Sequence, residues 1–480
     1  GLLNTRESTV DFSQRTTAGQ WLIDFPEAIT VESWPGIASG VGIVQDVTLT
    51  AETDTNRPAT ITRFPNDTHL TLTTTLNYDS AGRLTSRNLI GDNVGTRTTS
   101  YSNFANNRYP GQVTNPKGHA TTYSDFDIRF GTIESRGDPN NQTTEWDRDP
   151  FGRVISHTNS DDIETTTSYN DCPTGCGITV YGIAPAFYVQ RYSSITPIHR
   201  TYFDRLGRVI REEVQSFDGT SYSKRDFKFD LQGRIEKYSL PYFSGTANSV
   251  ELGYDLRDRI DNVLRPDGSS TATNYSVNLT DSHVVVTVTD YVKKADGTSD
   301  GTQVKRSEYN ILGELKKTTD GYGTSTDPVT TYTFDANSSL LTATVDDGVT
   351  SITTTFENDA AGNQTKIIGP NIGTVTKTYT ALNQIRTMMD NKSQTTTYIF
   401  EKLGRIFSVT NTDGTSSWTW DTATNGTGKL ASRSNPGFSE TYSYFSDGRL
   451  KDVVTNITPI GGSSGTNYTT SHTYDSSEIG

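Results

Sequence analysis

Apolar and polar side chains alternate along most of this chain with the two-residue period of β-strands. Residues 59–64 read ATITRF and residues 70–76 read LTLTTTL, so that every second side chain would share one face of a sheet. Runs of three threonines precede Phe356 and Tyr398, and threonine favours strands. No segment carries the longer apolar period of a helix. The pattern predicts an all-β protein without substantial helix.

A short phrase separates many of these strands: an aromatic residue, an acid, two variable residues, glycine, arginine and an aliphatic residue. It is clearest at residues 78–84 (YDSAGRL), 203–209 (FDRLGRV) and 229–235 (FDLQGRI). Further copies follow at intervals of roughly 20 to 26 residues, which is the signature of one structural unit repeated along the chain. The residues expected to define the repeat are Tyr78, Asp79, Gly82, Arg83, Trp146, Gly152, Arg153, Phe203, Asp204, Gly207, Arg208, Phe229, Asp230, Gly233, Arg234, Tyr254, Asp255, Gly404, Arg405, Gly448 and Arg449.

Each repeat contains two strand signals and two turn signals, which predicts a β-hairpin. In the first turn, the phrase itself, glycine would supply the positive φ of a tight hairpin with a bulge. The second turn is of the kind seen at residues 116–118 (PKG) and 266–268 (PDG). Serial hairpins pair edge to edge into a ribbon, and the right-handed twist of strands would coil that ribbon into a spiralling tube or shell wall.

In this geometry, each residue of the phrase has an expected structural role. The aromatic ring should pack against its equivalents in adjacent repeats, and the acid should accept backbone N–H bonds within the turn. The arginine should reach an acid or a carbonyl of a neighbouring repeat, with its stem lying over the ring. A residue copied once per repeat more often builds architecture than performs chemistry, so these positions predict a scaffold.

Composition narrows the possible functions. The chain has 480 residues, 42 basic and 56 acidic, for a net charge of −14, which argues against nucleic acid as a partner because phosphate contacts need clustered Lys and Arg. Only 32% of residues are hydrophobic, as expected for a wall with solvent on both sides. No apolar run is long enough to span a membrane.

The two cysteines and the chain ends add little chemistry. Cys172 and Cys176 predict either a small local disulfide or two free thiols, and no nearby pair of ligands would complete a zinc site. Residues 1–6 (GLLNTR) do not resemble a signal peptide, and both ends are expected to be cut from a longer protein. We expect residues 1–75 to form a β lead-in or capping segment and residues 76–480 to form the repeat array.

The phrase resembles the YD repeat of Rhs proteins, of teneurins and of the shell components of insecticidal toxin complexes. The resemblance covers roughly residues 59–480 and includes residues 115–123 (NPKGHATTY), which are similar to a linking stretch of bacterial members. It implies a spiralling β-sheet around a hollow cavity, which in bacterial relatives commonly holds a toxic C-terminal domain until delivery. The conserved core that closes such shells is not recognisable in this sequence.

Some copies depart from the pattern. Arginine is lost at Glu314, both glycine and arginine are lost at Ser338 and Ser339, and the acid is lost at Thr380. We expect these repeats to keep the fold, with local changes of curvature or insertions.

Catalytic signals are weak. The histidines are His69, His119, His157, His199, His283 and His472, and they do not form a metal-binding or hydrolase motif. The local groupings worth testing for a polysaccharide lyase are His119 with Tyr123, His157 with Arg153, and His199 with Tyr202. We expect a non-enzymatic protein with no catalytic residues, no metal and no cofactor.

The sequence therefore predicts a structural shell segment of a secreted or cell-surface bacterial protein, which encloses a C-terminal toxin domain carried elsewhere. Its partners would be that toxin domain or neighbouring shell segments. The first alternative is an adhesive surface fibre that binds glycans or proteins, with Trp418 and Trp420 as stacking platforms. The second alternative is the polysaccharide lyase.

Overall fold

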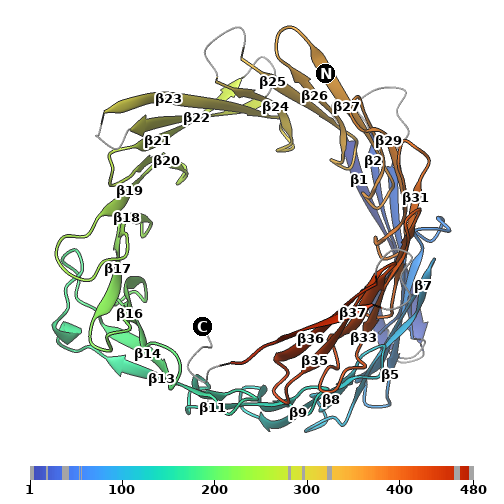
Figure 1. The fold of residues 1–480 in the computed structure, drawn as a ribbon, viewed down its shortest axis with the longest axis horizontal. Helices are drawn as coiled ribbons and strands as arrows, with labels where there is room; N and C mark the ends of the chain where they lie inside the picture. The colour runs from blue at the N-terminus through green and yellow to red at the C-terminus, as the bar shows by residue number, and fades with distance from the viewer. Residues whose placement is uncertain are drawn as a thin grey trace. The chain divides into compact units, whose positions relative to one another are not determined.

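The computed structural model describes residues 5–17, 20–34, 43–52, 55, 57–278, 283–293, 298–321, 327–458 and 465–474. Its contacts divide the chain into two units, which are described separately. Unit 1 comprises residues 1–144, 333–343 and 353–473, and unit 2 comprises residues 145–332, 344–352 and 474–480. The strands cross these boundaries in places, and Figure 1 labels them in chain order.

The strands are numbered in the order in which they occur along the chain. The first group is β1 (Thr5–Thr17), β2 (Gln20–Trp34), β3 (Ile43–Ala51), β4 (Pro58–Arg63), β5 (Leu72–Tyr78), β6 (Leu84–Gly91), β7 (Val94–Ser102), β8 (Gln112–Thr114), β9 (Ala120–Asp127) and β10 (Thr132–Gly137). The second group is β11 (Thr143–Arg148), β12 (Val154–Thr158), β13 (Glu164–Asp171), β14 (Phe187–Ser193), β15 (His199–Phe203), β16 (Val209–Gln215), β17 (Tyr222–Phe229), β18 (Ile235–Ser239), β19 (Ser249–Tyr254), β20 (Ile260–Leu264), β21 (Ser270–Asn278), β22 (His283–Lys293), β23 (Ser299–Tyr309), β24 (Leu315–Asp320), β25 (Val329–Phe334) and β26 (Leu340–Asp346). The third group is β27 (Ser351–Asn358), β28 (Gln364–Gly369), β29 (Gly373–Tyr379), β30 (Ile385–Met389), β31 (Thr395–Phe400), β32 (Ile406–Asn411), β33 (Gly414–Trp420), β34 (Leu430–Asn435), β35 (Phe438–Tyr444), β36 (Leu450–Ile457) and β37 (Thr466–Ser471).

Antiparallel pairing of strands that follow one another along the chain builds the fold within each unit. In unit 2, β15 pairs with β16 and β16 with β17, and in unit 1, β31 pairs with β32 and β32 with β33. The only helical element among the described residues is the short 3₁₀ turn η1 (Gly175–Gly177). The described residues contain no helix long and apolar enough to cross a membrane. The predicted all-β array of antiparallel hairpins is confirmed.

Unit 1 contains two runs of strands that are far apart in sequence but lie side by side. Figure 1 shows the red strands β33 to β37 next to the blue and cyan strands β5 to β9. The two runs touch: Gln45 Nε2 in β3 donates to the carbonyl of Ala360 at 2.8 Å, and Asn140 Nδ2 donates to the carbonyl of Thr427 at 2.9 Å. We call residues 43–144 the N-terminal run, residues 353–458 the C-terminal run, and their line of contacts, which lies mostly at hairpin turns, the seam. Such layering is expected of a spiralling sheet.

Few side chains are fully buried, because a single sheet has solvent on both faces. The one buried hydrophobic cluster of the described residues lies in unit 2 and joins Val180, Tyr202 and Ile210. Val180 belongs to the insertion between β13 and β14, which folds back onto the sheet. The rest of the array has no comparable core, which accounts for its low hydrophobic content.

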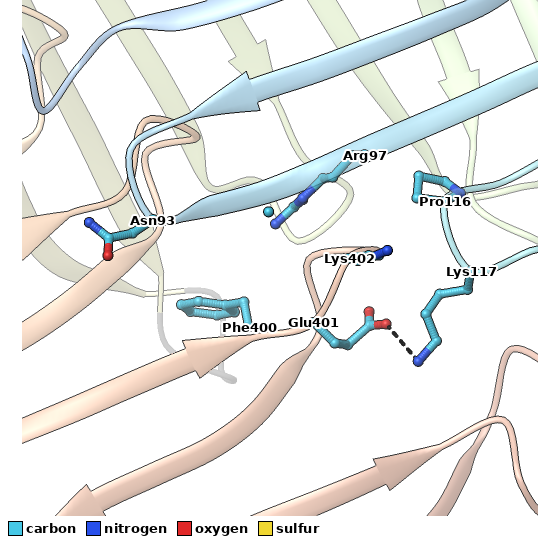
Figure 2. A pocket seen from close by; sticks show the side chains of 8 residues that line it. Asn93, Arg97, Pro116, Lys117, Phe400, Glu401 and Lys402 are labelled. Carbon is cyan, nitrogen blue, oxygen red and sulfur yellow. Dashed lines mark ion pairs between the residues drawn. The ribbon is translucent and has the colours of Figure 1, made fainter.

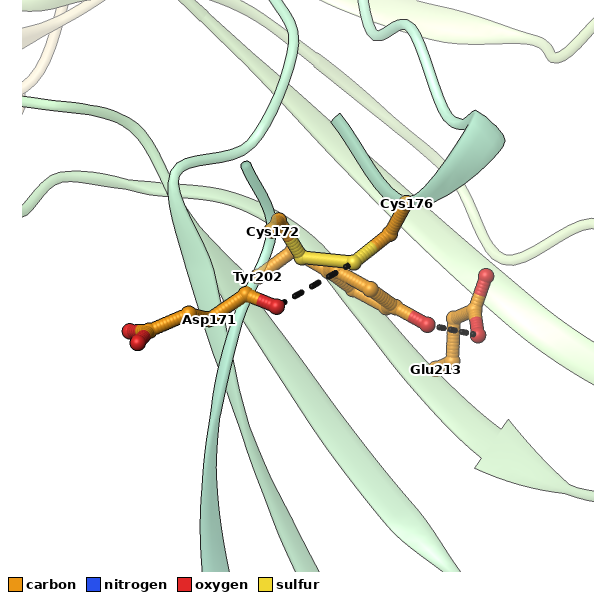
Figure 3. The surroundings of a disulfide bond; sticks show 5 residues. All are labelled: Asp171, Cys172, Cys176, Tyr202 and Glu213. Atoms are coloured by element: carbon orange, nitrogen blue, oxygen red, sulfur yellow. Dashed lines mark hydrogen bonds between the residues drawn. A yellow bond between two sulfur atoms is a disulfide. The ribbon is translucent and has the colours of Figure 1, made fainter. Parts of the chain in front are cut away.

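A disulfide between Cys172 and Cys176 closes the first turn of this insertion, with the two Cα atoms 5.0 Å apart. Figure 3 shows it beside Tyr202, whose hydroxyl donates to Glu213 Oε2 at 3.1 Å. Burial and the Glu213 carboxylate raise the pKa of Tyr202 to about 12, so this hydroxyl stays a donor. The predicted local disulfide is confirmed, and the alternative of two free thiols is wrong.

The disulfide encloses a turn that the backbone would not readily adopt alone. Gly175, Cys176 and Gly177 have φ angles of 76°, 51° and 69°, and left-handed backbone is unfavourable for a cysteine. A link across so short a loop is worth about 2 kcal/mol by loop-closure entropy. We therefore expect the disulfide to hold the insertion against the Tyr202 cluster.

Replacing both Cys172 and Cys176 with serine should loosen the insertion without unfolding the sheet. We expect faster hydrogen exchange at the amides of Ile178 and Val180, which donate to Gly175 and Ile183 within the insertion. Amides of β19 and β20 in the same unit are the control and should keep their protection. Unchanged exchange at Ile178 and Val180 would show that packing alone holds the insertion.

Candidate functional site

The turn formed by the repeated phrase, called the phrase turn below, is a compact network of hydrogen bonds around one carboxylate. Gly207 N donates to the carbonyl of Asp204 at 3.1 Å, and Asp204 N donates to the carbonyl of Arg208 at 3.0 Å. Asp204 Oδ1 accepts the N–H groups of Leu206 and Arg208, at 2.8 and 2.9 Å. Asp204 Oδ2 accepts Arg208 Nε at 2.7 Å, and these contacts lower the pKa of the Asp204 carboxyl despite its burial. The acid therefore organises its own turn, as predicted.

A bulge follows each such turn. Phe203 pairs with Val209, and the register shifts between Tyr202 and Phe203. The same aromatic-to-aliphatic pairing with a shift recurs in other phrase hairpins, including Tyr78 with Leu84, Phe229 with Ile235, Tyr254 with Ile260, Phe400 with Ile406 and Tyr444 with Leu450. The predicted bulged hairpin is confirmed.

The arginine of one repeat covers the aromatic ring of the next. Arg208 lies over Phe229 with its guanidinium carbon 4.6 Å from the ring centroid, and Arg234 lies over Tyr254 at 4.3 Å. Equivalent contacts join Arg83 to Phe104, Arg153 to Tyr169, Arg259 to Tyr275 and Arg405 to Trp420. Each contact is worth about 0.5 to 2 kcal/mol, depending on how far it is desolvated.

A hydrogen bond reinforces the same junction. Tyr254 donates its hydroxyl to the carbonyl of Ile235 at 2.7 Å, and Ile235 directly follows Arg234 of the preceding repeat. Trp420 Nε1 donates to the carbonyl of Ile406 at 2.8 Å in the same way. Equivalent bonds run from Tyr169 to Val154, Tyr275 to Ile260, Tyr379 to Gln364 and Tyr444 to Leu430. Ring, arginine and carbonyl together couple each repeat to its neighbour.

Two details differ from the sequence-based expectation. The arginine pairs first with the acid of its own turn, as Arg83 does with Asp79 at 2.6 Å, although Arg234 and Arg405 also reach an acid of the next repeat. The ring contacts between successive repeats that the structure shows for the clearest phrases are made by the arginine, which lies over the ring of the next repeat, as Arg208 does over Phe229. The physical reason is that an arginine beside its own turn can satisfy its own carboxylate and cover a ring face of the next repeat at once.

In the irregular repeats, other residues take the positions of the missing glycine or acid, and the turn is kept. Ser338 takes the glycine position with a φ of 63°, so this turn survives the loss of glycine as expected, and Asn383 takes the same position in its repeat with a φ of 60°. Around Gly152 the carboxylate that organises the turn is Asp149, which accepts Arg153 Nε at 2.6 Å. Trp146 lies farther back in this repeat and packs against His157 with the ring centroids 5.4 Å apart and the rings tilted by 33°.

The glycine of the phrase should be required because it readily adopts a positive φ, and not because a larger side chain would clash with its neighbours. Gly207 has φ of 75°, and a Cβ added there would meet no atom within 4 Å. Gly207→Ala should therefore lower the free energy of unfolding of unit 2 by about 1 to 2 kcal/mol through the left-handed backbone alone. Gly207→Asn is the matched control and should cost much less, because asparagine tolerates this region. Urea unfolding measures both, and equal losses would contradict the explanation.

Besides the repeated turns, unit 1 has a cluster of charged side chains on its seam. Arg405 lies between two acids, 3.0 Å from Glu401 Oε1 and 2.7 Å from Asp421 Oδ2. From the N-terminal run, Lys117 approaches Glu401 at 3.6 Å and Asp421 at 3.8 Å, and His119 Nε2 lies 3.8 Å from Asp421. Figure 2 shows Lys117 reaching across to Glu401.

The electrostatics of this cluster favour its ionised form. Glu401 and Asp421 are only 8% and 9% exposed, and burial alone would raise the pKa of both carboxyls. The bonds from Arg405 outweigh burial and lower both pKa values, and Asp421 Oδ1 also accepts the N–H of Gly428 at 2.8 Å. A lowered carboxyl pKa stabilises the folded state above the pKa of the unfolded chain, and this contribution is lost as the pH falls through the folded value.

A polar gap of about 430 Å³ adjoins the cluster and is lined by Asn93, Gly95, Arg97, Pro116, Lys117, Phe400, Glu401 and Lys402. Arg97 reaches Gln384 across the seam at 3.3 Å, and burial lowers the pKa of its guanidinium. Figure 2 shows residues of both runs lining this gap. The seam is therefore joined by polar and charged contacts more than by apolar packing.

The sequence pattern does not predict the seam. Lys117 and His119 belong to a predicted turn and linking stretch, His119 is grouped with Tyr123 as a candidate for a lyase, and neither is expected to meet Glu401 or Asp421. The Arg97–Gln384 and Asn140–Thr427 bonds each bridge 287 positions, a separation that no local pattern encodes.

The structure does not assemble the three groupings considered for a lyase. His119 bonds Asn115 and lies 3.8 Å from Asp421, His157 packs against Trp146, and Tyr202 is buried and bonded to Glu213. The side chain of His283 lies outside the described residues. Among the described residues, no three His, Cys, Asp or Glu side chains are grouped to hold a metal ion.

Arg405 should be the residue on which the seam cluster depends. Arg405→Met would leave Glu401 and Asp421 as poorly compensated buried charges, at a cost of about 3 to 5 kcal/mol. We expect faster hydrogen exchange at the amides of Ala381 and Thr427, which bond Asp92 and Asn140 across the seam.

Lys117→Met is the matched control. Lys117 is 34% exposed and makes only long ion pairs, so its loss should cost no more than about 1 kcal/mol. If both variants raised seam exchange equally, the buried charges would not be what holds the two runs together.

Serial antiparallel hairpins, a bulged acid–glycine–arginine turn and ring-to-arginine coupling define a hairpin-repeat sheet of the YD type. No family model matches the chain, and no curated protein matches its sequence. Among solved structures, it superposes on a chain of the TcdB2-TccC3-TEV crystal structure with a TM-score of 0.72 and 12% identity, over 98% of this chain and 33% of that one.

Two further solved structures are similar to lower degrees. A chain of the TcdB2-TccC3-Cdc42 crystal structure matches 98% of this chain and 40% of its own length, with 10% identity and a TM-score of 0.45. A chain of the Photorhabdus luminescens Tc holotoxin pore matches 93% of this chain and 27% of its own, with 11% identity and a TM-score of 0.32. The chain thus spans well under half the length of these proteins. The resemblance to YD-repeat toxin-complex proteins is confirmed at the level of the fold.

Proposed function

We propose that this chain is a structural segment of a YD-repeat shell, in a secreted or cell-surface bacterial protein of the Rhs type. The shell would enclose a toxin domain carried elsewhere in the polypeptide and help to deliver it. The observation that carries this proposal is the shared fold with the TcdB2-TccC3-TEV chain, which extends over 98% of the residues at a TM-score of 0.72.

The internal construction supports a wall. Each repeat is coupled to the next by arginine, ring and carbonyl, so the array can extend without a central core. In unit 1 the seam joins two runs through Arg97, which donates to Gln384, and through Lys117, which approaches Glu401, and these contacts would keep adjacent layers from parting. A container needs both kinds of contact, along the ribbon and between its layers.

The described residues give less support to the alternatives. Trp420 donates its indole N–H to Ile406 and is covered by Arg405, so its ring is engaged in the array and is a poor platform for a sugar. The groupings for a lyase are dispersed. We therefore place encapsulation ahead of adhesion and catalysis, and neighbouring shell segments ahead of glycans as partners.

Protease protection tests enclosure directly. The natural polypeptide that contains these residues would be purified and digested under native conditions, and the fate of its C-terminal segment followed by mass spectrometry. Enclosure predicts that this segment resists digestion in the intact protein but is cut rapidly when expressed alone. The Arg405→Met variant should increase cleavage, and Lys117→Met should not. Equal cleavage of the intact and isolated segments would refute enclosure.

A further inference from the structure

The polar gap on the seam of unit 1 is lined by an excess of positive charge. Three cationic side chains line it, those of Arg97, Lys117 and Lys402, with one carboxylate, that of Glu401. The excess stands out in a chain whose net charge is −14. Figure 2 shows Arg97 on β7 and Lys117 on the turn before β9, both in the N-terminal run, and Lys402 on a phrase turn of the C-terminal run. Both runs therefore contribute cations to one cavity.

The acid in the gap is largely neutralised by a residue outside it. Arg405 donates to both oxygens of Glu401, from Nε to Oε1 at 3.0 Å and from Nη2 to Oε2 at 3.2 Å. Lys117 Nζ lies 3.6 Å from Glu401 Oε2, which is longer than a hydrogen bond. Little of the negative charge of Glu401 is therefore left to balance the cations that line the gap.

Arg97 is the least compensated of these cations. A guanidinium carries several N–H donors, and Arg97 makes one side-chain hydrogen bond among the described residues, from Nη2 to the neutral amide oxygen of Gln384 at 3.3 Å. Its Nε is buried without a partner. Burial lowers the pKa of the guanidinium, and the opposing influence comes from Glu401, which Arg405 already holds. A half-buried cation without a counter-ion of its own is costly, and an anion in the gap would remove that cost.

We propose that the gap binds a small multivalent phosphoryl anion, of the size and charge of pyrophosphate, which joins the two runs of unit 1. Arg97 would hold the phosphoryl oxygens with the fork of its guanidinium, and Lys117 and Lys402 would act as point charges from the two runs. The gap of about 430 Å³ is many times the ~30 Å³ share of one water molecule, so an anion of several heavy atoms fits. This inference does not depend on the enclosure of a toxin.

The bound anion would strengthen the seam by electrostatics. Without it, Lys402 of the C-terminal run faces the like charges of Arg97 and Lys117 across the gap. With it, all three cations are attracted to a common centre, and repulsion between the runs becomes attraction. Because the site needs both runs in place, the anion would bind the folded chain and stabilise it by mass action.

Isothermal titration calorimetry of the intact chain with pyrophosphate, in chloride buffer of constant ionic strength, tests the site. We expect a single saturable site with a Kd below about 1 mM. Arg97→Gln should weaken binding at least about tenfold and Lys402→Gln at least about threefold, because each removes a charge from the gap. Lys392→Gln is the matched control and should leave the affinity unchanged, since Lys392 is exposed on the turn after β30 in the same run and does not line the gap.

The Lys402 variant keeps the test decisive. Lys402 is exposed at the tip of its turn, so its replacement should not disturb folding even if Arg97→Gln does. Unchanged affinity in Lys402→Gln, or no binding of pyrophosphate by the wild-type chain up to about 10 mM, would overturn the proposal. An equal loss of affinity in Lys392→Gln would assign the binding to the general charge of the surface and overturn it as well.

Hydrogen exchange tests whether the anion joins the two runs. With pyrophosphate bound, exchange should slow at the amides of Gly118 and Gly404, which donate within the two turns that carry Lys117 and Lys402. The amide of Gly448, in another phrase turn of the C-terminal run, is the control and should exchange at its original rate. Slowing in only one of the two turns, or equal slowing at Gly448, would show that the anion does not bridge the seam.

Discussion

The contact between the phrase arginine, its own acid and the ring of the following repeat is the interaction on which the whole array depends. Arg208 holds the Asp204 carboxylate and covers Phe229, and the bulge at each turn makes both contacts possible. A hydrogen bond from the next aromatic residue to the carbonyl after the arginine, as from Tyr254 to Ile235, completes the junction. Each repeat is therefore stabilised by its neighbour, and a lone hairpin would lack half of its partners.

This coupling explains how a long chain folds with little hydrophobic core. Polar backbone groups are satisfied along the ladder, and the rings are shielded by guanidinium groups instead of by other apolar residues. Where a true core exists, around Val180, Tyr202 and Ile210, an insertion closed by a disulfide covers one face of the sheet. At the seam of unit 1, ion pairs take the place of apolar packing, and Arg405 pairs with two buried acids. The edges of the array are thus the surfaces on which the two runs of unit 1 meet.

Much of the fold could be predicted because its chemistry is local. The acid, glycine and arginine of a turn lie within five residues, so their hydrogen bonds and the positive φ of Gly207 follow from the phrase. Replacement of the glycine by Ser338 was tolerated as expected, with a φ of 63°, and Asn383 takes the same position with a φ of 60°. The arginine's first partner was misjudged, because a sequence does not reveal that the bulge turns the side chain back to its own acid. The division at residue 75 stays a prediction.

By itself the sequence determined the β-strands, the bulged turns and the order in which hairpins pair, because each depends on residues a few positions apart or in the adjacent repeat. Only the tertiary structure decided which turns meet across the seam. Lys117 and Glu401 come from two runs of unit 1 that are far apart in sequence, and no local pattern encodes a contact between residues so widely separated. Ala381 is covered in the same way, because its N–H donates to Asp92 of the other run. Burial at a turn of unit 1 thus depends on which run packs against it.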